Sequence, residues 1–309
     1  MNRPASNLKG HLAALFTVLI WGTTFISTKV LLKAFTPIEI LFIRFIIGYL
    51  ALILMSPHKL MIKERKHELL FLGAGLSGVT LYFLLENIAL TLTYASNVGI
   101  VVSIAPIFTA FFAHMFLAGE KLKPSFFIGF ITAMAGIFLI SYNGSTVMKL
   151  NPLGDILAVL AAAVWGVYSV FSKKISNLGY PTIMSTRRIF FYGLVFMLPA
   201  LFYFKVDIDP AQVIKPIYLL NIIYLGLGAS AICFVTWNLA AKLLGAIKSS
   251  LYIYIVPVIT VAVSFIILHE KITGVAVFGI LLTLLGLVLS ERNFKSEKGR
   301  LPFFHKLFD

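Results

Sequence analysis

Charged residues are scarce in this chain of 309 residues: Asp, Glu, Lys and Arg together make up only 12% of the sequence. An average soluble domain carries about twice that share. Hydrophobic residues make up 60%, and the mean hydropathy is +0.97. One soluble core hides much less apolar surface than this, so lipid must cover the remainder. The composition excludes an ordinary soluble fold and favours an integral membrane protein.

Cysteine is nearly absent, and the sequence lacks the common motifs of enzymes. Cys233 lies alone in an apolar run, so it forms no intrachain disulfide and fits no thiolate metal cluster. There is no HExxH, GxSxG or Walker pattern, and no pair of carboxylates within the apolar runs. We therefore expect a protein that is not an enzyme, with no catalytic residues, no metal and no cofactor.

Long apolar runs recur along the whole chain. A helix needs about 20 apolar residues to cross the hydrocarbon core of a membrane. Such runs lie at about 11–32, 37–56, 68–91, 95–117, 124–142, 153–174, 182–204, 216–240, 245–268 and 273–290. Runs of this length favour helices over a membrane barrel. The predicted fold is an all-α integral membrane protein with ten transmembrane helices, and the first run is too long for the core of a signal peptide.

Basic residues outnumber acidic ones by 26 to 12, which gives a net charge of +14. In a soluble protein this positive charge would suggest nucleic acid as a partner. Most of the basic residues instead fall in loops on one side of the predicted membrane: Arg3, Lys9, Lys59, Lys63, Arg65, Lys66, Lys121, Lys123, Lys173, Lys174, Lys242, Lys248, Arg292, Lys295, Lys298, Arg300 and Lys306. Because basic loops stay cytoplasmic, we expect a multi-pass protein of a bacterial-type cell (inner) membrane with both termini inside. The expected partners are then membrane lipids and a small-molecule substrate, and not nucleic acid.

The second half of the sequence repeats landmarks of the first. An offset of 144 residues relates Trp21-Gly22 to Trp165-Gly166, Lys29 to Lys173, Pro37 to Pro181 and Arg44 to Arg188. Offsets of 151 and 150 relate Asn87 to Asn238, Ala95 to Ala246, Pro106 to Pro257 and Glu120-Lys121 to Glu270-Lys271. Ten spans thus divide into two sets of five, and because five is odd, the second set crosses in the opposite sense. We predict two inverted five-helix repeats, at 11–144 and 145–292, between a cytoplasmic N-terminus (1–10) and a basic cytoplasmic C-terminus (293–309).

These landmarks resemble the drug/metabolite transporter superfamily, and within it the EamA-type transporters. The resemblance rests on Leu19 to Phe25, Pro37 to Arg44, Ala89 to Ala95 with Pro106, Gly119 to Leu122, Trp165-Gly166, Pro181 to Arg188 and His269 to Ile272. It implies ten helices, cytoplasmic termini and transport of small solutes, commonly the export of amino acids or related metabolites. It leaves the substrate open, because one fold can serve many ligands.

An inverted repeat is typical of secondary transporters, in which a site between the halves opens alternately to each face. We predict a secondary transporter of small polar or amphipathic metabolites, acting by alternating access. One alternative is an importer or exchanger of another small solute, such as a cofactor or a drug-like cation. A membrane enzyme or a scaffold that transports nothing is an alternative of a different class.

Four ionisable residues within the spans are candidates for proton coupling or charge recognition, because charges inside a bilayer are costly and usually face a cavity or a partner. They are Glu86, Arg44, Arg188 and His114. Glu86 could exchange a proton or bind an amine, or it could form a structural pair with Lys29 or another basic residue. The two arginines could attract a carboxylate or lock a gate, or they could extend to lipid headgroups. His114 could take a proton or serve in packing.

Aromatic and amide side chains are the candidates for a cavity lining. They are Trp21, Tyr82, Asn87, Ser103, Trp165, Tyr168, Trp237, Asn238 and Tyr252. Aromatic belts at the membrane interface and polar links between helices are the competing interpretations. Pro106 and Pro257 are predicted to kink the fourth and ninth helices.

Glycines lie seven residues apart in the fifth and tenth predicted helices: Gly129 and Gly136, then Gly279 and Gly286. Small residues at this spacing allow two helices to approach closely. They predict either packing between these helices within one chain or a homodimer formed through them.

Overall fold

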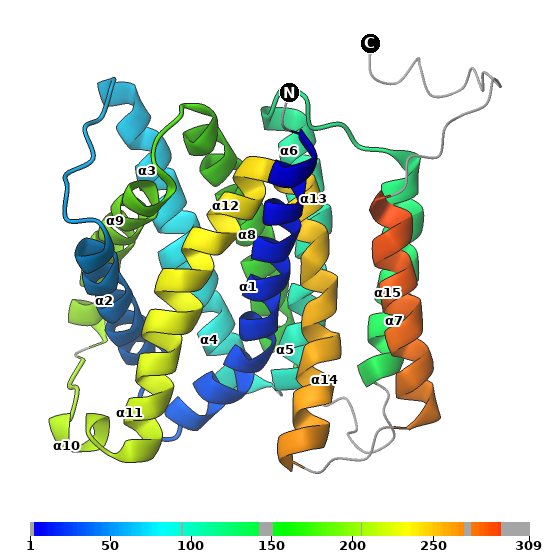
Figure 1. The fold of residues 1–309 in the computed structure, drawn as a ribbon. Coiled ribbons are helices and arrows are strands. Elements are labelled where there is room, and N and C mark those ends of the chain that lie inside the picture. The colour runs from blue at the N-terminus through cyan, green and yellow to red at the C-terminus, as the bar shows by residue number, and fades with distance from the viewer. Residues whose placement is uncertain (1–2, 94, 142–150, 205, 269–272, 292–309) are drawn as a thin grey trace.

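The computed structural model describes residues 3–93, 95–141, 151–204, 206–268 and 273–291, and every regular element in these ranges is a helix (Figure 1). In chain order the helical passes are α1 (Arg3–Leu31); α2 (Pro37–Met55); η1 (Arg65–His67), α3 (Glu68–Gly75), η2 (Leu76–Leu81) and α4 (Tyr82–Leu92); α5 (Ala95–Val102) and α6 (Ala105–Phe116); α7 (Pro124–Ser141); α8 (Pro152–Asn177); α9 (Thr182–Tyr203); α11 (Pro216–Ile223), η3 (Tyr224–Ile232) and α12 (Cys233–Leu244); α13 (Ala246–Ser250), η4 (Leu251–Tyr254) and α14 (Ile255–Leu268); and α15 (Gly274–Glu291). The short α10 (Pro210–Val213) lies in the connection before α11.

These passes confirm the all-α prediction. Seven helical stretches of the described chain are long and apolar enough to cross a membrane, and two shorter apolar helices lie within α7 and α15. The observed bounds differ from the predicted runs by a few residues, except that α1 begins at Arg3 and not near residue 11. The predicted C-terminal tail, Glu270 and Lys271 lie outside the described residues.

Prolines and polar caps set the starts of the helices. Pro37, Pro152 and Pro216 occupy the first turn of α2, α8 and α11, where a missing N–H costs no hydrogen bond. Thr36 and Glu39 form a capping box on α2, with the backbone N–H of Thr36 donating to Glu39 Oε2 at 2.8 Å. The punctuation seen in the sequence thus corresponds to real helix ends.

The two sets of five passes share structural details as well as sequence landmarks. The third and eighth passes each contain a π-helical segment, η2 and η3, and the offset of 151 residues places Leu76–Leu81 within the end of Tyr224–Ile232. Lys29 Nζ donates to the carbonyls of Leu90 and Thr93 at the end of α4. Lys173 Nζ donates to those of Ala241 and Lys242 near the end of α12. The two repeated lysines therefore satisfy equivalent helix C-termini.

Helices α7 and α15 pack along each other beside the main bundle (Figure 1). Their glycines form the contact: a Cβ atom on Gly136 would lie 2.5 Å from the carbonyl oxygen of Gly279, and one on Gly129 would lie 2.5 Å from that of Gly286. The small residues thus bring the fifth and tenth passes together within one chain. A homodimer through the same helices stays a prediction.

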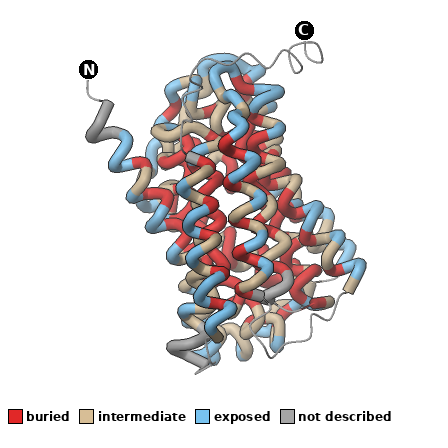
Figure 2. The backbone as a smooth tube through the Cα atoms, turned by 90° about the vertical axis from the view of Figure 1, so that its right-hand side faces the viewer, coloured by how far each residue is buried: buried red, intermediate tan, exposed pale blue. Residues whose placement is uncertain are grey.

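Buried residues line the interior of the bundle, and exposed residues lie on its outer faces (Figure 2). The largest buried side chains are aromatic and include Trp237, Tyr168 and Phe45. Many large hydrophobic residues are exposed on the outer faces, such as Leu54 at 84% and Phe202 at 81%. A soluble monomer rarely exposes so many. These faces suit contact with lipid hydrocarbon.

Candidate functional site

A cavity lies between the two repeats, near the middle of the bundle. The cavity is narrow and partly open at one side. The first repeat contributes residues of α1, α2, α4 and α5, and the second contributes Trp165 of α8, Ile253 of η4 and Val256 of α14. Six sequence-predicted candidates line it: Trp21, Arg44, Tyr82, Glu86, Ser103 and Trp165.

The two repeated tryptophans meet at the cavity wall. The rings of Trp21 and Trp165 pack edge to face, with centroids 5.2 Å apart. Trp21 Nε1 donates to the carbonyl oxygen of Ala229 at 3.0 Å. Trp165 Nε1 is buried and has no hydrogen-bond partner among the described residues. Positions that are equivalent in sequence therefore differ in chemistry, because only Trp165 keeps a donor for a ligand.

The Arg44 side chain of α2 is almost completely buried, with 3% exposed. Its Nε donates to Ser230 Oγ of η3 at 3.0 Å, and its Cζ lies 4.4 Å from the ring centroid of Phe83. Such a cation–π contact stabilises a desolvated guanidinium. No carboxylate oxygen of the described chain lies within 4.0 Å of the Arg44 guanidinium nitrogens. The arrangement fixes a positive charge beside the cavity, and Glu86 is the nearby acidic group that acts on it electrostatically.

Glu86 brings a carboxyl group to the same cavity from α4. The side chain is 6% exposed, and Oε2 has no hydrogen-bond partner in the described part of the chain. The charge of Arg44 acts on this carboxyl group, and the Tyr82 side chain hydrogen-bonds to it. The suggested pair with Lys29 does not form, because that ammonium is bound to backbone carbonyls at the end of α4. A buried acceptor without a partner is costly, so a ligand donor would relieve it.

The amide candidates lie outside the lining and bind other helices. Asn238 Oδ1 accepts hydrogen bonds from Tyr168 Oη and Ser172 Oγ, both at 2.7 Å, and its Nδ2 donates to Thr186 Oγ1 at 3.0 Å. Asn87 Nδ2 donates to the carbonyl oxygen of Pro37 at 3.2 Å. These contacts match the competing interpretation of polar links between helices.

Other aromatic and titratable candidates stand further from the cavity. Trp237 packs behind the lining, with its ring centroid 5.1 Å from that of Trp21. Tyr252 Oη lies 2.5 Å from His11 Nδ1, between η4 and α1. His114 is exposed, and its Nδ1 lies 3.3 Å from the carbonyl oxygen of Glu120. The structure does not bring these three side chains into the lining.

The two prolines follow breaks in their passes. The fourth pass is interrupted between α5 and α6, and Pro106 begins the second part. In the ninth pass, Pro257 lies in the first turn of α14, directly after the 3₁₀ segment η4. Ser103 lies at the first break and lines the cavity, with its Oγ donating to the carbonyl oxygen of Gly99 at 2.7 Å.

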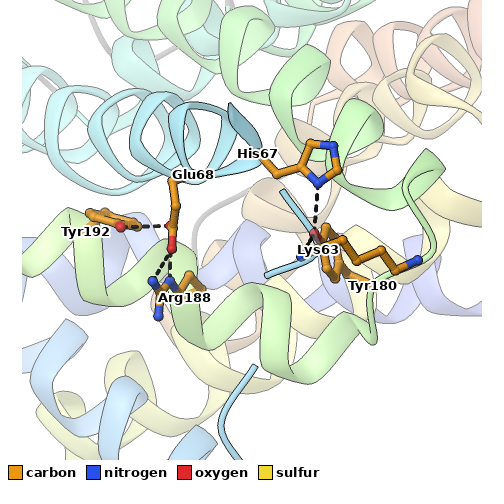
Figure 3. A network of polar contacts seen from close by, with 6 residues as sticks. All are labelled: Lys63, His67, Glu68, Tyr180, Arg188 and Tyr192. Atoms are coloured by element: carbon orange, nitrogen blue, oxygen red, sulfur yellow. Dashed lines mark hydrogen bonds and ion pairs between the residues drawn. The ribbon is translucent and has the colours of Figure 1, made fainter. Parts of the chain in front are cut away.

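Arg188, the repeat equivalent of Arg44, belongs to a separate polar network (Figure 3). It forms an ion pair with Glu68, and Tyr192 Oη donates to Glu68 Oε2 at 2.8 Å. Nearby, Tyr180 Oη contacts His67 Nδ1 at 2.8 Å and accepts from the backbone N–H of Lys63 at 2.9 Å. These contacts join η1, α3 and the segment before them to α9 and to the connection between α8 and α9.

Several members of these sites were not predicted from the sequence. Phe83, Thr24 and Phe25 line the cavity, and Glu68 neutralises Arg188. The offset of 151 places Leu219 opposite Glu68, so this acid breaks the repeat as Glu86 does. That asymmetry was a usable signal for Glu68. The aromatic and small residues of the lining gave no such signal in the sequence, because every pass is rich in residues of these types.

Comparison with known proteins agrees with this architecture. The sequence profile of the EamA-like transporter family matches residues 8–142 and 152–292. The chain is 28% identical over 288 residues to an uncharacterized transporter of Archaeoglobus fulgidus, covering 92% of this chain and 98% of the relative. It is 27% identical over 281 residues to a probable terminal-alkyne amino-acid exporter of Streptantibioticus cattleyicolor, covering 91% and 92%.

A solved crystal structure supports the fold alone. It superposes with a TM-score of 0.73 at 22% identity, covering 94% of this chain and 97% of the other. The family profile matches both repeats and almost the whole chain, and the relatives that it resembles are named as transporters and not as enzymes. This chain therefore belongs to the EamA-like transporter family and is a multi-pass membrane transporter.

Proposed function

We propose that the protein exports amino acids or closely related zwitterions by alternating access, and that the cavity between the repeats is the substrate site. The observation that carries the proposal is the presence of two opposite charges, Arg44 and Glu86, in one lining. Neither charge forms an ion pair within 4.0 Å in the described chain. A zwitterion would supply a partner for both.

The lining matches the parts of an amino acid. A substrate carboxylate would accept hydrogen bonds from the Arg44 guanidinium and from Trp165 Nε1, which has no other partner within the described residues. A substrate ammonium would donate to Glu86 Oε2. The rings of Trp21, Tyr82 and other lining aromatics would cover an apolar side chain. A substrate with only one of the two charges would leave the other group unpaired.

The repeat architecture supports alternating access. Both repeats contribute to the cavity, so a rocking motion of one against the other would open it to either face. The Glu68–Arg188 network joins the repeats away from the cavity and would have to break in such a motion. The name of the Streptantibioticus cattleyicolor relative supports an amino-acid substrate and the export direction. We place the protein in the cell membrane with both termini in the cytoplasm, because most of its basic loops share that side.

Flux measurements in proteoliposomes test this function. Purified protein should exchange a radiolabelled amino acid, such as phenylalanine, with an unlabelled internal pool. The des-amino and decarboxylated analogues of the same compound should compete weakly, because each satisfies only one of the two charges. Equal competition by a permanent organic cation would favour the drug-like alternative. No flux for any amino acid across a full panel would contradict the proposal.

Glu86→Gln tests the role of the carboxylate. We expect amino-acid exchange to fall roughly 10- to 100-fold, since a charged hydrogen bond contributes about 1.5–3 kcal/mol. Competition by the des-amino acid should not change. Glu64→Gln is the control, because Glu64 is an exposed acid outside the cavity that pairs with Lys66. If proton coupling also runs through Glu86, the variant loses the pH dependence of transport; an unchanged rate and pH profile would contradict both roles.

A further inference from the structure

Two hollows adjoin each other on the outer surface between α2 and α9, away from the central cavity. The first lies at the end of α2 and the start of α9 and is lined by Ile53, Pro57, Lys59, Leu60, Met184, Arg187 and Arg188. The second lies further along both helices and is lined by Phe42, Ile46, Leu50, Leu194, Val195 and Leu198. Tyr49 and Phe191 belong to both linings, so the hollows meet at these two side chains.

The first hollow is basic. Arg187 donates to the backbone carbonyls of Ser56 and His58, which fix its guanidinium but leave its charge in place. Lys59 is exposed and has no partner among the described residues. Arg188 is neutralised by Glu68 (Figure 3). Two positive charges thus remain at this end, on the side where basic loops predict the cytoplasm.

The second hollow is an apolar groove. Its lining runs from Phe42 to Leu50 on α2 and from Phe191 to Leu198 on α9, which is about 10–12 Å along each helix at 1.5 Å per residue. Leu50, Val195 and Leu198 are exposed at 53%, 41% and 44%, so the groove is open to the membrane. The rings of Tyr49 and Phe191, 6.4 Å apart, form the boundary with the basic hollow.

We propose that these joined hollows bind one molecule of anionic phospholipid. The phosphate would lie against Arg187 and Lys59, and one acyl chain would lie in the groove between α2 and α9. Charge complementarity favours an anionic lipid, because each Lys or Arg that lies near an anionic headgroup adds to the binding free energy. The open apolar groove favours a lipid over a free anion, which would use only the basic end. The proposal is independent of the transported solute.

Thermal unfolding of the purified, delipidated full chain in detergent tests the lipid site. We expect dioleoyl-phosphatidylglycerol to raise the unfolding midpoint by roughly 3–6 °C, and the zwitterionic phosphatidylcholine of the same chain length to have little effect. Inorganic phosphate at equal concentration should not reproduce the shift. Equal protection by phosphatidylcholine or by phosphate would overturn the proposal, since either result removes one half of the recognition.

Substitutions at both ends of the site locate the effect. Lys59→Gln should weaken the apparent affinity for phosphatidylglycerol about fivefold, while Lys242→Gln, an exposed lysine elsewhere, should not. Val195→Trp should fill the groove and abolish the shift, while Val275→Trp, at a similarly exposed position on α15, should keep it. Lys59 and Val195 are exposed, so these variants are expected to fold. An equal response of each variant and its control would refute the assignment to this surface.

Discussion

Asn87 and Asn238 show how repeat-related residues differ once their neighbours are known. The sequence makes them equivalent at an offset of 151 residues. In the described part of the chain, Asn87 donates a hydrogen bond to the carbonyl oxygen of Pro37, whereas Asn238 forms three, with Tyr168, Ser172 and Thr186. The difference comes from side chains on other passes, which no local pattern reveals.

Asn238→Leu should therefore destabilise the protein more than Asn87→Leu does. The first substitution removes the acceptor of the Tyr168 and Ser172 hydroxyl groups, while Thr186 Oγ1 keeps its bond to the carbonyl oxygen of Thr182. It should lower the free energy of unfolding by roughly 1–3 kcal/mol. The second leaves one backbone carbonyl and should cost less. Unfolding in mixed micelles with increasing denaturant measures both variants against the wild type. Equal losses would show that the Asn238 contacts contribute nothing beyond a single helix link.

At the same scale, sequence reasoning selected the charged members of the lining and three aromatic ones, Trp21, Tyr82 and Trp165, but missed its other apolar members. Arg44 and Glu86 stood out because charge is rare in these passes, and both line the cavity. Phe83 lines it too, but phenylalanine is abundant throughout the chain, with 28 copies. Arg188 was paired with Arg44 by the repeat, yet Glu68 draws it into another network. The rarity of charge thus selected two lining residues, while repetition alone did not place Arg188 with Arg44.

At the scale of elements, the sequence predicted helix ends well and internal irregularities poorly. Proline and capping residues mark the starts of α2, α8 and α11, and the apolar runs give their lengths. The π-helical segments η2 and η3 were not predicted, because an apolar sequence is compatible with either helix type. They occur in equivalent passes, and Ser230 of η3 accepts the hydrogen bond from Arg44. Such segments frequently accompany functional sites.

The contact of α7 with α15 gives a prediction at this scale. Gly136→Ala should lower the thermal unfolding midpoint, because the added Cβ would lie 2.5 Å from both the Gly279 carbonyl oxygen and the Thr283 nitrogen. Gly274→Ala is the matched control at the start of α15, where nothing lies within 4 Å of an added Cβ. The control should be neutral or slightly stabilising, since alanine reduces the entropy of the unfolded chain. Parallel effects of the two substitutions would contradict the close approach.

At the scale of the whole molecule, the number of passes and their inverted division followed from hydropathy, parity and repeated landmarks. The position of the cavity between the repeats also agrees with that division, because Trp21 and Trp165 meet there. The set of cavity-lining side chains did not follow. It depends on how ten passes are arranged around each other, and hydropathy alone fixes the order of the passes but not their neighbours.

The orientation of this arrangement in the membrane is open to a direct measurement. Cys233 is buried, and Cys233→Ser provides a background without a native thiol. Lys59 and Lys215 are exposed lysines that charge counting assigns to opposite faces, so Lys59→Cys and Lys215→Cys form a matched pair. An impermeant maleimide added to intact cells should label only Lys215→Cys, and permeabilised cells should allow labelling of both. The reverse pattern would place the termini outside. It would also move the basic hollow between α2 and α9 to the outer leaflet, away from the anionic inner surface that the lipid proposal invokes.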